Sequence, residues 1–313
     1  MLTFIEGVVV PSRPSLALFS AVSSLLLCLG PASARAQDSR LPTFDLQRLQ
    51  LDPAALGSLM VGTGRTLPQG MLRFAVQGHY ENLPFHFQTR WEPGNGAGLV
   101  ENRFTMDVTA AYGVLPWLQV AAEVPYIVKQ GGKPHMDVAP PDGSGLATPW
   151  VGLRAALLRQ DFGFQVAADM SAALPLGREE LLARDKYAVH PRLQLGFLAE
   201  DWQVGGEAGV LLREKRDLGP LSGDSKDVIG NELRLAGTVT SRAGESTRGE
   251  VSVLVGVPLQ GGRVGAELLL AIRKHALSFM DLYVMGGPGV GAGADTPTFR
   301  FVGGVSFATS KVD

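Results

Sequence analysis

The stretch that decides the fold is residues 103–128, RFTMDVTAAYGVLPWLQVAAEVPYIV. Apolar side chains occupy every second position over 104–112 and again over 118–126. Three charged residues fall on the opposite parity: Arg103, Asp107 and Glu123. A repeat of two residues is that of a β-strand, whose successive side chains point to opposite faces. The stretch therefore predicts two strands joined by a short turn, each with one apolar and one polar face.

The same alternation recurs between residues 72 and 307 and gives twelve candidate strands in all. Most of the breaks near 113–117, 159–161, 199–201, 241–248 and 274–277 are short, and most of those near 81–99, 129–148, 177–188, 213–228 and 287–296 are long. Short turns on one rim and long loops on the other are the layout of an outer-membrane barrel. We predict an all-β fold, a closed antiparallel transmembrane β-barrel of about 12 strands, with short periplasmic turns and longer extracellular loops.

The regions outside the strands have their own signatures. Residues 15–30 form an uncharged apolar run, and Ala34-Arg35-Ala36 fits a cleavage site, so residues 1–36 are predicted to be a signal peptide. Residues 37–70 contain Pro53 and Pro68 and are predicted to be a plug-like segment in the lumen or a periplasmic segment beneath the barrel. The barrel is predicted over 71–308, and a tail over 309–313.

Charged residues of the polar faces are predicted to line the lumen. The set holds eight acids and seven arginines: Asp107, Glu123, Asp169, Glu207, Glu232, Glu250, Glu267, Asp281, Arg73, Arg103, Arg154, Arg192, Arg234, Arg273 and Arg300. A selective ion pore usually presents one dominant sign of charge. The balance therefore favours arginine–carboxylate pairing that stiffens a closed lumen.

Aromatic residues gather at the strand ends, where a bilayer has its interfaces. The predicted girdle consists of Tyr80, Tyr112, Trp117, Tyr126, Phe197, Trp202, Phe299 and Phe307. It implies outer-membrane lipid and lipopolysaccharide as partners. The net charge of −2 gives no reason to expect a nucleic-acid partner. Alternation alone is shared with a secreted soluble β-protein, which stays open as an alternative.

No catalytic, cofactor-binding or metal-binding residues are predicted. The five histidines lack metal-ligand spacing. Two stretches are rich in glycine, 61–70 and 286–295, and neither is followed by the Lys-Ser/Thr pair of a phosphate-binding loop. The sequence therefore predicts a protein that is not an enzyme.

Four stretches carry a family resemblance: 51–70, 111–128, 148–158 and 230–239. They resemble bacterial outer-membrane barrels of the OmpA family, the barrel part only. In that family the barrel is an anchor and a separate periplasmic domain grips the cell wall. This chain ends soon after the twelfth candidate strand, so wall tethering is not carried over, and no functional residue transfers. A looser likeness is to twelve-stranded barrels that pass small hydrophobic compounds.

Two functions follow for a membrane barrel. The first is a structural or anchoring role in the cell envelope, favoured by the balanced lumen charges. The alternative is a passive channel or transporter for small solutes, hydrophobic ones included, favoured by the long loops and the plug-like segment.

Overall fold

The computed structural model describes residues 41–87, 97–135, 138–160, 162–219, 227–241, 246–291, 293 and 295–309. The predicted signal peptide and most of the predicted C-terminal tail lie outside these residues. Within them, no helix is long and apolar enough to cross a membrane.

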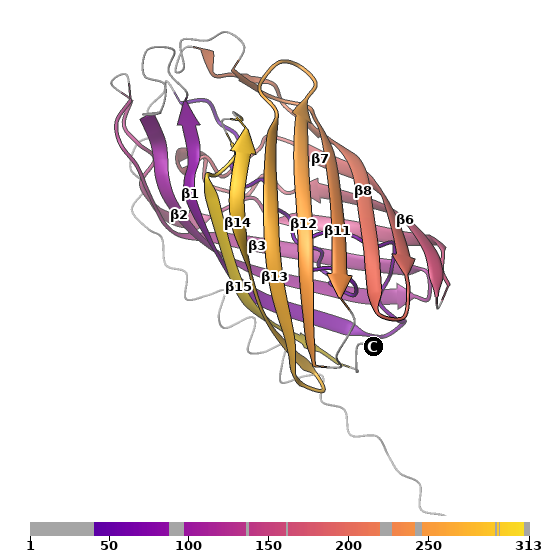
Figure 1. Ribbon diagram of the computed structural model, residues 1–313. Helices are drawn as coiled ribbons and strands as arrows, with labels where there is room; N and C mark the ends of the chain where they lie inside the picture. The colour runs from indigo at the N-terminus through magenta and orange to yellow at the C-terminus, as the bar shows by residue number, and fades with distance from the viewer. Residues whose placement is uncertain are drawn as a thin grey trace, which may run out of the picture. The chain divides into compact units, whose positions relative to one another are not determined.

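Twelve antiparallel strands close into a barrel (Figure 1). They are β1 Leu72–Phe87, β2 Ala97–Leu115, β3 Leu118–Gly131, β5 Trp150–Leu158, β6 Gly163–Ala173, β7 Ala188–Leu198, β8 Trp202–Arg213, β11 Glu232–Ser241, β12 Thr247–Pro258, β13 Gly265–Leu277, β14 Met280–Gly291 and β15 Phe299–Ala308. The connections on one rim also hold β4 Gly143–Leu146, the short helix η1 Glu179–Leu181, β9 Arg216–Asp217 and β10 Val228–Ile229. The closed twelve-stranded antiparallel barrel is the fold that the sequence predicts.

Strand pairing is continuous around the barrel but uneven. β1 and β15 close it in ten aligned pairs, from Arg73 with Ala308 to Asn82 with Phe299. β3 and β5 align over only six pairs, from Leu118 with Ala155 to Glu123 with Trp150. Beyond that point β3 pairs with β4 instead. The shortest run of paired residues between neighbouring wall strands is therefore that between β3 and β5.

Several strands run further than the sequence pattern predicts. β1 continues to Phe87 although a break is predicted from residue 81, and β14 continues to Gly291 although one is predicted from 287. The break predicted at 274–277 is strand, and the turn follows at residues 278–279. Gly, Pro and charged residues in these stretches are typical of loops, but main-chain pairing with a neighbouring strand continues through them.

The two faces of the wall separate by polarity. Six girdle residues are exposed on the outside, Tyr80, Tyr112, Trp117, Trp202, Phe299 and Phe307, and two are partly buried, Phe197 and Tyr126. Phe197 packs against Trp202 with ring centroids 5.6 Å apart, and edge-on against Phe164 at 5.1 Å. Because rings of this kind prefer a membrane interface, the outside suits contact with lipid.

The interior is filled by the chain that precedes β1. Phe44 and Leu46 belong to an apolar cluster with residues of the long connections, such as Leu182 and Leu218. Leu49 to Val61 pack on the inner faces of β12 to β15. Leu67 and Met71 pack with Ala111 of β2. The segment 41–71, hereafter the lumen segment, therefore passes from the long-connection rim to the short-turn rim.

Candidate functional site

The outer end of the lumen segment is bound to the long connections by main-chain contacts. The Leu46 N–H donates to the Leu182 carbonyl at 2.9 Å, and Arg216 Nε donates to the Thr43 carbonyl at 2.8 Å. The Asp45 N–H donates to the Asp185 carboxylate at 3.2 Å. Carbonyls and N–H groups inside a barrel must find partners, because water is excluded there. These bonds supply them and fix where the segment enters.

Two buried acids meet at this entry point. Burial raises the pKa of Asp45 to about 6, and the guanidinium of Arg103 opposes that shift. Burial likewise raises the pKa of Asp185, against the opposing charge of Arg213. Both carboxyls therefore hold protons to a higher pH than free aspartate does.

Arg48 lies further in and is the main ionic contact of the outer half. Its Nη2 lies 2.9 Å from Glu232 Oε1 and donates to the Gly265 carbonyl at 3.0 Å. Its Nη1 donates to Thr296 Oγ1 at 2.9 Å and to Asp295 Oδ1 at 3.2 Å. Although burial alone would raise the pKa of Asp295, the guanidinium of Arg48 and its arginine neighbours lower it. Asp295 is therefore charged at neutral pH.

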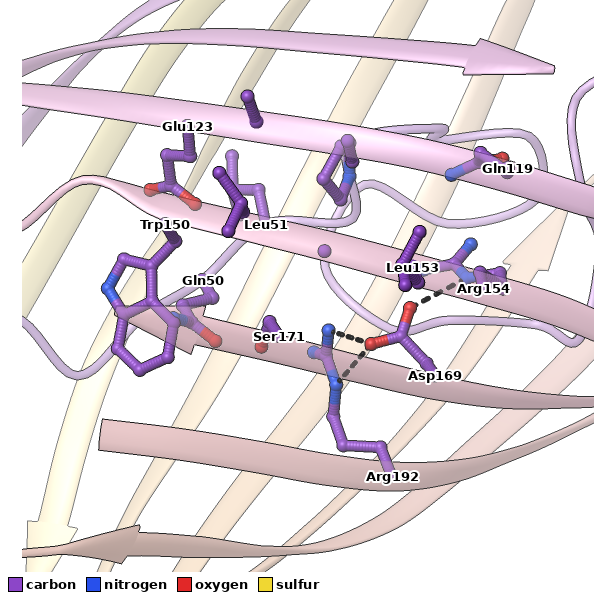
Figure 2. Close-up of a pocket in the computed structure, with 15 residues that line it drawn as sticks. Gln50, Leu51, Gln119, Glu123, Trp150, Leu153, Arg154, Asp169, Ser171 and Arg192 are labelled. Carbon is purple, nitrogen blue, oxygen red and sulfur yellow. Dashed lines mark hydrogen bonds and ion pairs between the residues drawn. The ribbon is translucent and has the colours of Figure 1, made fainter. Parts of the chain in front are cut away.

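In the middle of the lumen, Asp52 joins the segment to the wall. Its Oδ1 lies 2.7 Å from Arg154 Nη2, and Arg154 Nε donates to Asp169 at 3.0 Å. Arg192 donates to the same Asp169 carboxylate at 2.6 Å. Figure 2 shows Asp169 between the two guanidinium groups, with Gln50 and Leu51 of the segment close by. Asp169 thus pairs with two wall arginines. Arg154 uses its Nε for Asp169 and its Nη2 for Asp52 of the segment.

A tight turn of the segment is held by Glu250 of β12. Ser58 Oγ donates to Glu250 Oε1 at 2.5 Å, and the Leu59 N–H donates to Oε2 at 2.8 Å. The Ser58 hydroxyl also accepts the N–H groups of Met60 and Val61. From the neighbouring strand β13, Arg273 donates to the carbonyl oxygens of Ala55 and Gly57. The turn is therefore held by one acid and one base from the wall.

The inner end of the segment lies close to the wall. The Leu67 N–H donates to Gln119 Oε1 at 3.0 Å. Gly64 has a φ of 76°, and a Cβ there would lie 2.9 Å from the Gln165 backbone. Only glycine satisfies both the left-handed conformation and this close approach.

Most of the predicted lumen charges are buried in the structure. Twelve of the fifteen are buried, and Arg192, Glu207 and Asp281 are partly buried. Several pair within the wall: Arg300 Nε with Glu267 at 2.7 Å, Arg192 with Glu207 at 3.7 Å, Arg234 with Glu232 at 3.5 Å and Arg73 with Asp281 at 3.6 Å.

Some of the predicted charges also bond to the lumen segment, and others have neither kind of contact within the described ranges. Arg273 and Glu250 bind its main chain, and Arg234 donates to the Arg48 carbonyl at 3.1 Å. Asp107 pairs with His79 at 2.8 Å. Arg103 is buried, and none of its guanidinium nitrogens has a hydrogen-bond partner among the described residues. Glu123 borders the pocket of Figure 2.

Several residues of the site are missing from the sequence-based set. Glu81 pairs with Arg300, and Arg213 donates to Asp295 at 3.3 Å and to the Asp45 carbonyl at 3.2 Å. Both fall in stretches that the pattern assigns to loops. Continuing the alternation past the predicted end of β1 would have placed Glu81 on the inner face with His79.

Two small pockets border the segment in the part of the chain that the structure describes. The pocket bordered by Gln50, Glu123, Arg154 and Asp169 has a volume of about 30 Å³ (Figure 2). Another pocket, beside Arg48 and Asp295, has a volume of about 20 Å³. A cavity needs roughly 10–15 Å³ of such space for one water molecule. Each of these two pockets therefore has room for one or two waters and not for a larger solute.

The fold and the site define a class: a closed outer-membrane β-barrel whose lumen is occupied by its own N-terminal segment. Comparison with solved structures gives particular likenesses. An outer membrane channel of the COG4313 group from Pseudomonas putida F1 superposes with a TM-score of 0.59 at 12% identity, over 79% of this chain and 98% of that one. The NanC porin gives a TM-score of 0.51 at 13% identity, over 75% and 98%. At these identities the likeness shows the fold.

These likenesses and the closed barrel place the protein in the bacterial outer membrane. No family model matches the chain, and no curated protein matches it. These two structures are a channel and a porin, and neither is described as an OmpA-type anchor. The resemblance to the OmpA family therefore stays a prediction.

Proposed function

We propose that the protein is an outer-membrane channel for small solutes, and that the lumen segment is the plug that closes it. The observation that carries this proposal is the path of the segment from rim to rim, with wall residues bonded to its main chain at Thr43, Asp45, Arg48, Ala55 and Gly57. Without the segment, the buried charged side chains of the barrel wall would line a polar channel.

The bonds suit a plug that can leave. Most of them join a charged wall side chain to a backbone carbonyl or N–H of the segment, and either partner can exchange to water when the segment moves. Net hydrogen-bond free energies of about 0.5–1.5 kcal/mol each, or about 1.5–3 kcal/mol to a charged group, hold the segment collectively without fixing it permanently.

Removal of residues 37–65 tests the proposal directly. The shortened protein, refolded in detergent and inserted into a planar bilayer, should show steady conductance, while the full mature chain should be mostly closed. Melting in detergent monitors whether the shortened barrel still folds. Equal conductance of the two folded proteins would contradict the plug.

The structural role is a second candidate, because buried pairs such as Arg300 with Glu267 stiffen the wall. The structural role would be favoured if the barrel that lacks residues 37–65 folds and inserts into the bilayer but passes no ions. The likeness to channels favours the first candidate.

A further inference from the structure

The contacts of Arg48 have the form of a ligand in a binding site. Four oxygens surround its guanidinium. Asp295 Oδ1, Thr296 Oγ1 and the Gly265 carbonyl accept hydrogen bonds from it, and Glu232 Oε1 forms an ion pair with it. The four oxygens lie 2.9–3.2 Å from Nη1 and Nη2, two to each nitrogen. A planar fork of N–H donors is the group that such an arrangement matches, and a compact ammonium ion does not match it. We call these four oxygens the guanidinium cradle.

The wall is shaped for the group as well as charged for it. Gly256 of β12 and Gly265 of β13 are paired in register and lie beside the guanidinium. A Cβ on Gly256 would lie 1.9 Å from Arg48 Nη2, and one on Gly265 would lie 2.8 Å from Nη1. Either side chain would occupy the space of the guanidinium. The two glycines therefore leave a flat backbone surface that the planar group covers.

Both carboxylates of the cradle also have arginine partners in the wall. Arg213 lies 3.9 Å from Glu232 and 3.3 Å from Asp295, and Arg234 lies 3.5 Å from Glu232. The two acids therefore stay paired when Arg48 leaves, and the shape of the cradle rather than an excess of negative charge selects its occupant.

The cradle is also next to the outer rim. The small pocket beside it is bordered by Asp227, Val228 and Gly262, which belong to the long-connection rim, as well as by Glu232 and Asp295. A solute that enters from outside therefore meets the cradle before it reaches the middle of the lumen.

We propose that the cradle is a binding site for the guanidinium group of an external solute, and that Arg48 is the resident occupant which such a solute displaces. The proposal rests on the channel function and names a solute class for it. Displacement of Arg48 frees the outer half of the lumen segment, because Arg48 is its main ionic contact with the wall.

The test uses the full mature chain, methylguanidinium as the probe, and methylammonium at equal ionic strength as the comparison cation. In the wild-type protein, methylguanidinium at tens of millimolar should raise the open probability in planar bilayers. In Arg48→Ala the open probability should already be higher, on the order of 100-fold, since a buried pair has lost one partner. There methylguanidinium should raise the melting temperature in detergent with saturation, because it fills the empty cradle, and it should leave the open probability high, because it is not joined to the segment.

Two further variants sharpen the result. Adding Glu232→Gln to Arg48→Ala should abolish the saturable response. Arg184→Ala, which removes an exposed arginine paired with Glu179, should behave as wild type. The wild-type measurement keeps the test valid if Arg48→Ala fails to fold.

The outcomes separate the two proposals. Equal responses to methylguanidinium and methylammonium, or no saturable response in wild type and in a folded variant, would overturn the cradle while leaving the plug test untouched. A saturable melting shift in Arg48→Ala with no conductance in any variant, the one lacking residues 37–65 included, would support the cradle and overturn the channel.

Discussion

The guanidinium of Arg154 in β5 lies 2.7 Å from the carboxylate of Asp52 in the lumen segment, and both side chains are buried. This pair joins the middle of the segment to the wall, at the strands whose mutual pairing is shortest. Loss of one partner of a buried ion pair costs about 3–5 kcal/mol, because the other charge is left uncompensated.

Asp52→Asn tests this contact. The amide oxygen can still accept the Ala54 N–H, as the carboxylate does at 3.2 Å, so the local turn is kept while the charge is lost. Because Arg154 keeps Asp169 as a partner, the cost is smaller than for an isolated pair: we expect the free energy that holds the segment to fall by about 1.5 kcal/mol, and hence the open fraction to rise by roughly 10-fold. Bilayer recordings measure it. Asp201→Asn, at an exposed turn residue, is the matched control; an equal effect there would argue against a specific contact.

Glu250 and Ser58 are expected to be coupled. Glu250→Ala should cost about 1–3 kcal/mol, because the Leu59 N–H and the Ser58 hydroxyl lose their acceptor inside the lumen. Hydrogen exchange at the Leu59, Met60 and Val61 amides reports the loosening of the turn. A double-mutant cycle with Ser58→Ala should show an interaction energy of about 0.5 kcal/mol or more. Strict additivity would contradict the contact.

The outer end of the segment should loosen as pH rises. The raised pKa of Asp45, about 6 against an ordinary value of 3.8, means that the docked segment binds a proton that the released segment gives up. Docking is therefore most stable below pH 3.8, weakens between pH 3.8 and about 6, and has lost this contribution above that range. The carboxyl of Asp185 acts in the same direction, and the Arg103 guanidinium opposes it.

Conductance recorded at pH 5 and at pH 7.5 measures how docking of the segment depends on pH. The free energy that Asp45 contributes to docking is expected to change by an amount on the order of 2–3 kcal/mol over the full range. Asp45→Asn is neutral at every pH and should remove most of the dependence. A variant that keeps the full pH dependence would assign it to another group.

Arg300 should matter for the seam of the barrel. It bonds Glu267 through two nitrogens, at 2.7 and 3.2 Å, and it also pairs with Glu81 of β1 across the closing strand pair. Arg300→Ala should lower the free energy of unfolding by about 3–5 kcal/mol, since two buried acids lose their partner. Urea unfolding in detergent checks this value. Arg159→Ala, at an exposed arginine, should change stability little.

The sequence predicts the wall better than its contents. The alternation seen around Arg103 and Asp107 predicts where the strands lie, which face of each is polar and how many strands there are. It does so because a wall with lipid on one side and a polar interior on the other requires a period of two. It misses Glu81 and Arg213, because main-chain pairing extends past the residues where composition turns loop-like. It also places the predicted lumen arginines against acids alone. Arg234 and Arg273 also donate to carbonyls of the lumen segment, and such contacts depend on a fold-back that no periodicity records.

The lumen segment runs directly into β1, and β1 is one of the two strands that close the ring. Everything inside the barrel is thus covalently tied to its seam. If the segment packs against the curved sheet β2 to β15 before β1 pairs with β15, the interior fills while the ring is still open. Pairing of β1 with β15 then encloses the segment. Assembly in this order never requires the segment to be threaded through a finished barrel, because the step that seals the ring also encloses the segment.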